Sequence, residues 1–268
     1  MDFDGRLIVI TGGGSGIGAA LARRFAGENP RGVVIADKNL ADAKAVAAEV
    51  QGMAVQADVG YETEILRVIA QAESMYGPVD VWISNAGTVH PQGGPEIGDM
   101  GWQRQWDMHV MSHVWAARAL LPAMLDREDG YLVNVASCAG LLTSPGAMPY
   151  TVTKHAAVAL AESLAVVHAN TGVRFSCVCP GVVDTPLMSN GDQTAAKRAA
   201  RIASRMIPAW QAADTIVRDL EAERFLILTH PDETSAAARL RATDPDGYIA
   251  SVQDVWHAAS KGWVPASR

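Results

Sequence analysis

The chain has 268 residues, of which 49% are hydrophobic and 19% charged, and its formal net charge is −7. This composition is typical of a globular protein, and the length fits one large α/β domain with a substantial core. The sequence shows no basic stripe, no basic leader before an apolar run and no apolar stretch of membrane-spanning length. We therefore expect no nucleic-acid partner, no membrane span and a cytoplasmic location.

The first predicted elements are a strand, a glycine-rich turn and a helix. The strand covers 6–10 (RLIVI), the turn TGGGSGIG covers 11–18, and the helix covers 19–26. Glycines allow a tight backbone turn against a pyrophosphate, and the helix N-terminus offers unpaired N–H groups. Two registers fit this turn, one on Gly12, Gly16 and Gly18 and the other on Gly14, Gly16 and Ala19.

A second predicted strand, 32–36 (GVVIA), ends at Asp37. An acidic residue at this place binds the hydroxyls of an adenosine ribose and repels a 2′-phosphate. Asp37 therefore predicts NAD as the cofactor. NADP remains the alternative, because Lys38 is suited to accept the phosphate.

Further strands and helices alternate along the chain. Helices are predicted at 40–50, 62–76, 101–127 and 150–170, and strands at 53–57, 79–84, 131–136, 174–179 and 224–228. This alternation predicts an α/β protein, a single Rossmann-type domain whose doubly wound parallel sheet of about seven strands is flanked by helices. Ligands bind beyond the carboxyl ends of such strands, which carry Gly12, Asp37, Asn85, Ser137 and Pro180.

Three polar residues predict proton transfer at this edge of the sheet. Tyr150 and Lys154 are four residues apart and share a helix face, and Ser137 lies thirteen residues before the tyrosine. A phenol has an ordinary pKa of about 10, which a nearby ammonium is predicted to lower. Tyr150 then exchanges a proton with an alcohol oxygen while a nicotinamide exchanges the hydride.

These motifs, in this order, make residues 6 to about 228 similar to the classical short-chain dehydrogenase/reductase family. The motifs are TGGGSGIG, Asp58, Asn85-Ala86-Gly87, Ser137, Tyr150-x-x-x-Lys154, and Pro180-Gly181 followed by Thr185. The resemblance implies an NAD(P)-dependent oxidoreductase that interconverts a secondary alcohol and a ketone or aldehyde. It implies that Ser137 polarises the substrate oxygen, that Tyr150 is the general acid/base, and that Lys154 holds the nicotinamide ribose.

The resemblance also implies a wider cofactor site and an oligomer. The implied cofactor-binding residues are Gly12, Ser15, Gly16, Ile17, Gly18, Asp37, Asp58, Val59, Asn85, Ala86, Gly87, Tyr150, Lys154, Pro180, Gly181, Val183 and Thr185. The family pairs its long helices into homodimers and homotetramers. The apolar segment 156–167 fits such an interface, as do Trp102, Trp106 and Trp115 on the other long helix, and core packing explains them equally well.

The sequence departs from the family pattern at His109, where the family usually has a catalytic asparagine that holds a relay water. If the main-chain carbonyl holds this water, histidine can substitute. If the side chain is needed, the relay changes, and a histidine also titrates near neutral pH. His109 and His113 have the spacing of metal ligands on a helix, but without a third ligand we predict no metal.

Two further segments are predicted to form the substrate site. The stretch 138–149 and a substrate loop at about 186–210 supply the predicted pocket residues Cys138, Leu142, Met148 and Met188. Because these side chains are mainly apolar, we predict a small-molecule substrate that is mainly apolar as well. The C-terminal helical extension, about 231–268 with Trp256 and Trp263, either caps the pocket or reaches a neighbouring subunit.

Two alternatives to an NAD-dependent dehydrogenase stay open. One is an NADPH-dependent carbonyl reductase that reads the phosphate through Lys38. The other is a non-catalytic nucleotide-sensing protein of the same fold. Ser137, Tyr150 and Lys154 argue against a sensor, because nucleotide binding alone does not need all three, whereas His109 leaves it open. The three cysteines form no disulfide framework, and we predict free thiols.

Overall fold

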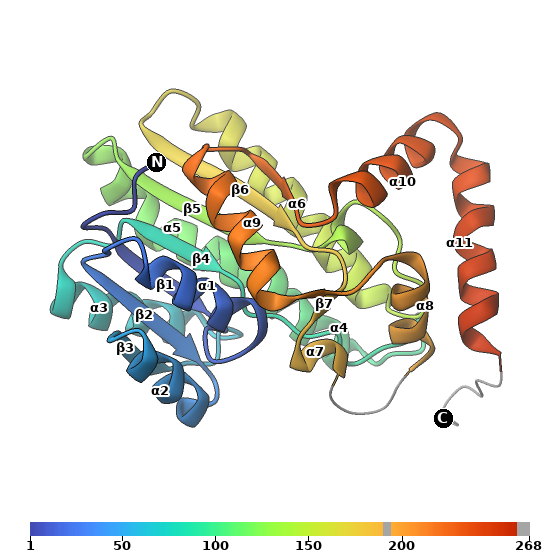
Figure 1. The fold of residues 1–268 in the computed structure, drawn as a ribbon, viewed down its shortest axis with the longest axis horizontal. Helices are drawn as coiled ribbons and strands as arrows, with labels where there is room; N and C mark the ends of the chain where they lie inside the picture. The colour runs from blue at the N-terminus through green and yellow to red at the C-terminus, as the bar shows by residue number, and fades with distance from the viewer. Residues whose placement is uncertain (190–193, 262–268) are drawn as a thin grey trace.

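The computed structural model describes residues 1–189 and 194–261 and is built on a seven-stranded parallel sheet (Figure 1). The strand order is β3-β2-β1-β4-β5-β6-β9, so the chain reverses direction across the sheet between β1 and β4. The predicted doubly wound sheet is thus confirmed. The strands are β1 (Leu7–Thr11), β2 (Gly32–Asp37), β3 (Met53–Gln56), β4 (Val81–Ser84), β5 (Gly130–Val135), β6 (Val173–Cys179) and β9 (Leu226–Leu228).

Helices cover both faces of the sheet, and β1 shows why. Its alternate side chains point to opposite faces, so Ile8 and Ile10 join one buried cluster while Leu7 and Val9 join another. The first cluster lies under α1 (Gly16–Ala26), α2 (Leu40–Glu49) and α9 (Ala209–Glu221). The second lies under α3 (Glu62–Tyr76) and α5 (Ser112–Asp126), and α6 (Met148–Val167) packs on β6 through a third.

The predicted helix 101–127 is not continuous. It consists of α4 (Asp99–Trp106), one π-helical stretch η1 (Asp107–Met111) and α5. A π turn inserts one residue into the helical register and rotates the side chains that follow. His109 lies in this stretch and packs against α6, so the irregularity occurs beside the predicted catalytic residues.

The C-terminal third adds elements outside the main sheet. Two short strands, β7 (Val183–Asp184) and β8 (Ile207–Pro208), pair with each other around α7 (Pro186–Ser189) and α8 (Ala195–Ala203). Two further helices, α10 (Pro231–Thr243) and α11 (Pro245–Ser260), follow β9, and α11 stands beside α8 (Figure 1). Residues 190–193 of the predicted substrate loop and Trp263 lie outside the described residues. Within the described ranges, no helix is long and apolar enough to cross a membrane.

Candidate active site

A cavity of about 820 Å³ lies beyond the carboxyl ends of the central strands. It is lined by every predicted strand-end residue, namely Gly12, Asp37, Asn85, Ser137 and Pro180. Of the predicted cofactor residues, all but Gly18 line it. The structure therefore brings together in one cavity the residues that the sequence placed at the edge of the sheet.

Close main-chain packing shapes the glycine turn. Gly12 and Gly16 have positive φ values of 62° and 52°, a conformation that glycine adopts without strain. A Cβ on Gly18 would lie only 2.2 Å from the carbonyl oxygen of Gly12. These three glycines favour the first of the two predicted registers. Gly18 lies beneath the turn rather than in the cavity wall.

Asn85 braces this turn from the neighbouring strand. Its side-chain amide donates to the carbonyls of Thr11 at 2.9 Å and Gly12 at 3.2 Å. Its main-chain N–H donates to the Thr11 hydroxyl at 2.9 Å. The loop after β4 is thus tied to the loop after β1, and their separation across the cavity is fixed.

The carboxylate of Asp37 is held at one end of the cavity. It accepts hydrogen bonds from the main-chain N–H groups of Gly14 at 3.0 Å and Asn39 at 2.9 Å. Lys38 lines the cavity beside it. The acidic group is therefore fixed next to the glycine turn, where an adenosine ribose is expected.

Arg104 of α4 holds the second acidic residue of this end, Asp58. One guanidinium nitrogen donates to both carboxylate oxygens, at 2.7 and 2.6 Å, and the guanidinium also lies 5.8 Å from the ring centre of Tyr61. No sequence pattern indicates this pair, because its members belong to distant segments and to no shared motif. Sequence reasoning therefore missed Arg104, whose guanidinium holds the Asp58 carboxylate.

Ser137 follows β5 and caps the short 3-10 helix η2 (Cys138–Gly140). Its hydroxyl oxygen accepts the main-chain N–H of Ala139 at 3.1 Å. The contact to the Cys138 sulfur, at 4.0 Å, is weak. The hydroxyl is thereby oriented, and its proton remains available to a substrate oxygen in the cavity.

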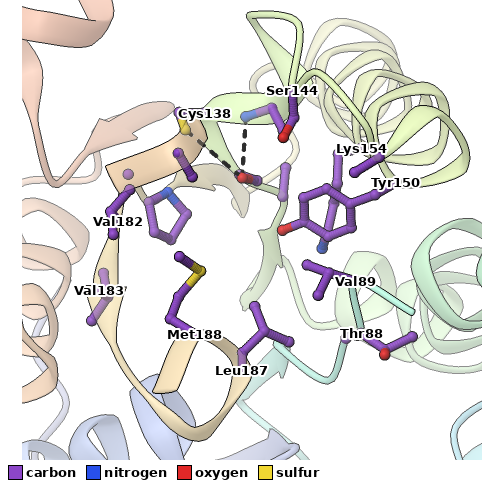
Figure 2. A pocket seen from close by; sticks show the side chains of 18 of the residues that line it. Thr88, Val89, Cys138, Ser144, Tyr150, Lys154, Val182, Val183, Leu187 and Met188 are labelled. Atoms are coloured by element: carbon purple, nitrogen blue, oxygen red, sulfur yellow. Dashed lines mark hydrogen bonds between the residues drawn. The ribbon is translucent and has the colours of Figure 1, made fainter. Parts of the chain in front are cut away.

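Tyr150 and Lys154 lie in the first half of α6. The lysine nitrogen is 5.7 Å from the centre of the tyrosine ring and donates to the Val135 carbonyl at 3.0 Å. Figure 2 shows the hydroxyl end of Tyr150 directed into the pocket, with Val182 and Val183 across from it. The predicted pair on one helix face is thus present, and Ser137 lines the same cavity.

The predicted effect of Lys154 on Tyr150 is wrong for this structure. Burial raises the pKa of Tyr150 to about 12, and the opposing influence of the Ser137 side chain is smaller. Burial also lowers the pKa of Lys154 to about 8. Desolvation disfavours both charged forms and is the largest influence on each pKa. At neutral pH the phenol therefore keeps its proton.

His109 is completely buried, and hydrogen bonds occupy both of its ring nitrogens. Nε2 accepts the main-chain N–H of Thr88 at 3.1 Å, so Nδ1 carries the proton and donates to the Thr153 hydroxyl at 2.9 Å. Burial, helped by the charge of Lys154, lowers the pKa of His109 well below its usual range. The predicted titration near neutral pH is therefore wrong, because the ring stays neutral.

His113 lies one helical turn after His109, and the hydrogen bonding of its ring is different. Neither of its ring nitrogens has a hydrogen-bond partner among the described residues, and burial lowers its pKa to about 3. The two histidines do not act as a pair of metal ligands, since His109 uses both nitrogens for hydrogen bonds. The described ranges hold no cluster of three or more metal-ligating side chains.

The substrate end of the cavity agrees only in part with the prediction. Cys138, Leu142 and Met188 line the cavity, but Met148 does not and is 45% exposed. Met148 is two residues before Tyr150, and a helix rotates by roughly 200° over two residues. When the tyrosine faces the cavity, Met148 faces away from it. Burial also raises the pKa of the Cys138 thiol to about 11, so this group is no nucleophile.

Elements α8, α10 and α11 supply this wall; they lie in the predicted substrate loop and in the predicted C-terminal extension, but sequence reasoning did not name their pocket side chains. Its apolar members include Ala196, Ala200, Ala237, Val252 and Val255. Tyr248, Val252 and Val255 also line the cavity, and their spacing of four and three residues marks one helix face. That stripe was a usable signal.

The strand-end cavity, the glycine turn and the Ser137–Tyr150–Lys154 arrangement define a nucleotide-dependent oxidoreductase. The family described as short chain dehydrogenase matches residues 6–196, and the chain belongs to it. The protein is thus an NAD(P)-dependent dehydrogenase that acts on CH–OH groups.

Similar proteins of known name and structure agree with this family. The chain is 33% identical over 270 residues to the 1-deoxy-11-beta-hydroxypentalenate dehydrogenase of Streptomyces exfoliatus, a match that covers 97% of this chain and 92% of the relative. It is 32% identical over 187 residues to the L-fucose dehydrogenase of Bos taurus, and this match covers 69% of the chain and 68% of the bovine enzyme. The fold is also similar to that of a short chain dehydrogenase/reductase from Burkholderia phymatum, which was solved in complex with NAD. The two structures align with a TM-score of 0.83 and 28% sequence identity, and the alignment covers 92% of this chain and 96% of the Burkholderia chain.

Proposed function

We propose that the protein oxidises a medium-sized, mainly apolar secondary alcohol to the ketone, with NAD as the hydride acceptor. The observation that carries the proposal is the carboxylate of Asp37, fixed by two main-chain N–H groups beside the glycine turn. Such a group accepts hydrogen bonds from ribose hydroxyls and repels a 2′-phosphate. The Streptomyces exfoliatus relative, which matches 97% of the chain, is named for a hydroxylated substrate, and the similar Burkholderia structure holds NAD.

The remaining cofactor contacts are those that the family resemblance implies, and all of these residues except Gly18 line the cavity. In this proposal the turn Gly12, Ser15, Gly16 and Ile17 receives the pyrophosphate, supported from below by Gly18. Asp58 and Val59 meet the adenine, and Asn85, Ala86 and Gly87 form the wall. Lys154 holds the nicotinamide ribose, while Pro180, Gly181, Val183 and Thr185 flank the nicotinamide.

The protein's own residues handle the proton. Ser137 donates a hydrogen bond to the substrate oxygen, because the Ala139 N–H already occupies and orients its own oxygen. Tyr150 accepts the alcohol proton in its phenolate form, which is the minor form at neutral pH because of burial, and Lys154 in its ammonium form stabilises that phenolate. His109 acts at a distance as a positioning residue, since it binds the main chain of Thr88 and the side chain of Thr153.

We also propose that residues 1–268 act as one domain in a homodimer or homotetramer. Trp106 of α4 is 39% exposed and suits a subunit interface, whereas Trp115 packs against the core under α5. The exposed tryptophan favours assembly through the long helices.

A second candidate is NADPH-driven carbonyl reduction, which the position of Lys38 in the cavity wall favours. Calorimetric titration with NAD⁺, NADH, NADP⁺ and NADPH separates the two. We expect the NAD pair to bind at least about tenfold more tightly, and Asp37→Ala to remove this preference. A preference for the NADP pair that Lys38→Ala abolishes would instead establish the reductase.

A further inference from the structure

The C-terminal helices form part of the substrate site rather than an appendage. The main-chain N–H of Thr143 donates to the hydroxyl of Tyr248 on α11 at 2.6 Å. Arg198 of α8 donates to the carbonyl of Ala259, near the end of α11, at 2.8 Å. These contacts attach α11 both to the loop that follows Ser137 and to α8, and Figure 1 shows the helix standing beside α8.

Tyr248 is the most unusual side chain of this wall. It is 5% exposed, and it lines the same cavity as Tyr150. Its hydroxyl oxygen accepts the proton of Thr143 N–H, but a phenol also carries a proton of its own to donate. Within residues 1–189 and 194–261, no group accepts that second proton.

The surroundings make an unused donor costly. Val252 and Val255 of α11 and Ala196 and Ala200 of α8 line the cavity with Tyr248, and the polar side chains of Lys197, Glu233 and Thr234 line it as well. A buried hydroxyl without an acceptor costs free energy comparable to a lost hydrogen bond. Ser251 lines the cavity too, but its hydroxyl donates to the Tyr248 carbonyl of its own helix at 2.8 Å. Tyr248 therefore offers a donor that its own chain does not use.

We propose that Tyr248 binds a second oxygen of the substrate, which is a secondary alcohol with a carboxylate remote from its carbinol. Tyr150 and Ser137 contact the reacting oxygen, and Tyr248 donates a hydrogen bond to the other one. The apolar wall between them contacts the carbon skeleton. This inference rests on the proposed function and adds what orients the substrate, because a second polar contact fixes which carbon faces the nicotinamide.

The test uses matched pairs of alcohols that differ only at the remote end. The (ω−1)-hydroxy acids of six, eight and ten carbons are compared with the alkan-2-ols of equal length, with NAD⁺ as cofactor. We expect a hydroxy acid of fitting length to exceed its alkanol in kcat/KM. In Tyr248→Phe, the KM of that acid should rise about tenfold with kcat preserved, while the alkanol is unaffected.

Controls separate recognition from a structural role. Tyr248→Phe also removes the partner of the Thr143 N–H, and a loosened loop would slow acid and alkanol alike. Gln253→Ala, at an exposed position of the same helix outside the cavity lining, should change neither. Equal losses for acid and alkanol in Tyr248→Phe, or no loss for the acid, would overturn the inference.

Calorimetric binding of the same hydroxy acids to the NADH-loaded protein keeps the two proposals distinct. Tighter binding of an acid than of its alkanol, weakened in Tyr248→Phe, supports the role of Tyr248 even when no alcohol is oxidised. In that case the proposed oxidation fails and the binding site stands. If no acid binds more tightly than its alkanol, the inference is wrong whatever the turnover.

Discussion

The two ends of the cavity are built on different principles. At the nucleotide end, close packing between main-chain segments sets the shape of the cavity. A Cβ on Gly12 would lie 2.8 Å from the Cα of Ala86, and a Cβ on Gly18 would lie 2.2 Å from the carbonyl oxygen of Gly12. At the substrate end, side chains from α8, α10 and α11 form the wall. A main-chain fit tolerates few residue types, whereas a wall of apolar side chains tolerates many.

This difference separates what the family shares from what the individual protein adds. The nucleotide end serves one cofactor, so its residues form a short motif. The substrate end is assembled from segments about 50 residues apart in the chain, between Ala196 and Tyr248, and no motif marks it. The reacting residues Ser137, Tyr150 and Lys154 lie at the junction of the two ends.

The largest effect is expected at this junction. Tyr150→Phe removes the proton acceptor and leaves the ring in place, so kcat should fall by about 10²–10⁴-fold. The dissociation constant for NAD should stay near that of the wild type. Steady-state NADH absorbance and calorimetry measure the two quantities. Unchanged turnover on a confirmed substrate would assign the proton transfer to another residue.

Gly18→Ala tests whether main-chain packing defines the nucleotide end. Its Cβ cannot be accommodated unless the turn or α1 shifts, so the affinity for NAD should fall at least about tenfold. Gly98→Ala is the matched control, because a Cβ there has no atom within 4 Å in the described structure. Equal NAD affinities in the two variants would show that the turn is adaptable, and the contrast between the ends would be lost.

The sequence predicted much of the fold and of the nucleotide end, because periodicity, glycine spacing and strand ends are local signals. The predicted strands lie within about two residues of the observed ones, as is usual for element boundaries. It did not predict that Arg104 holds Asp58 or that Thr88 donates to His109, since these contacts join distant segments. It misplaced Met148, because the start of α6 sets which face meets the cavity. It also missed the effect of burial on the Tyr150 pKa, which no spacing reveals.

A smaller effect, on the pH dependence of stability, is expected from His113. Its pKa is about 3 in the folded protein against an ordinary 6.5, so the unfolded chain binds the proton more readily. Its neutral form contributes full stability above pH 6.5, and that contribution is lost as the pH falls from about 6.5 toward 3. Urea unfolding between pH 4 and 8 should therefore show a shallower pH dependence in His113→Leu than in the wild type.

The control for this measurement is His257→Leu, which changes an exposed histidine on α11. The stability of this variant should change with pH as steeply as that of the wild type. At pH 7 the His113→Leu variant should be at least as stable as the wild type, because it removes two buried nitrogens without partners. An unchanged slope in His113→Leu would mean that the ring is hydrated or partnered in solution.

The smallest effect is expected for His109→Asn, which restores the residue usual in the family at this position. His109 does not line the cavity, and its neutral ring cannot supply a titration near pH 6.5. Turnover should therefore stay within about tenfold of the wild type, and the pH profile of kcat should keep its shape. The melting temperature should fall, since the Thr88 N–H and the Thr153 hydroxyl lose a partner. Thr153→Val, which removes the partner of Nδ1, is the matched variant. A hundredfold loss of turnover, or the disappearance of an acidic limb from the pH profile, would make the imidazole part of the proton path and not only a support for it.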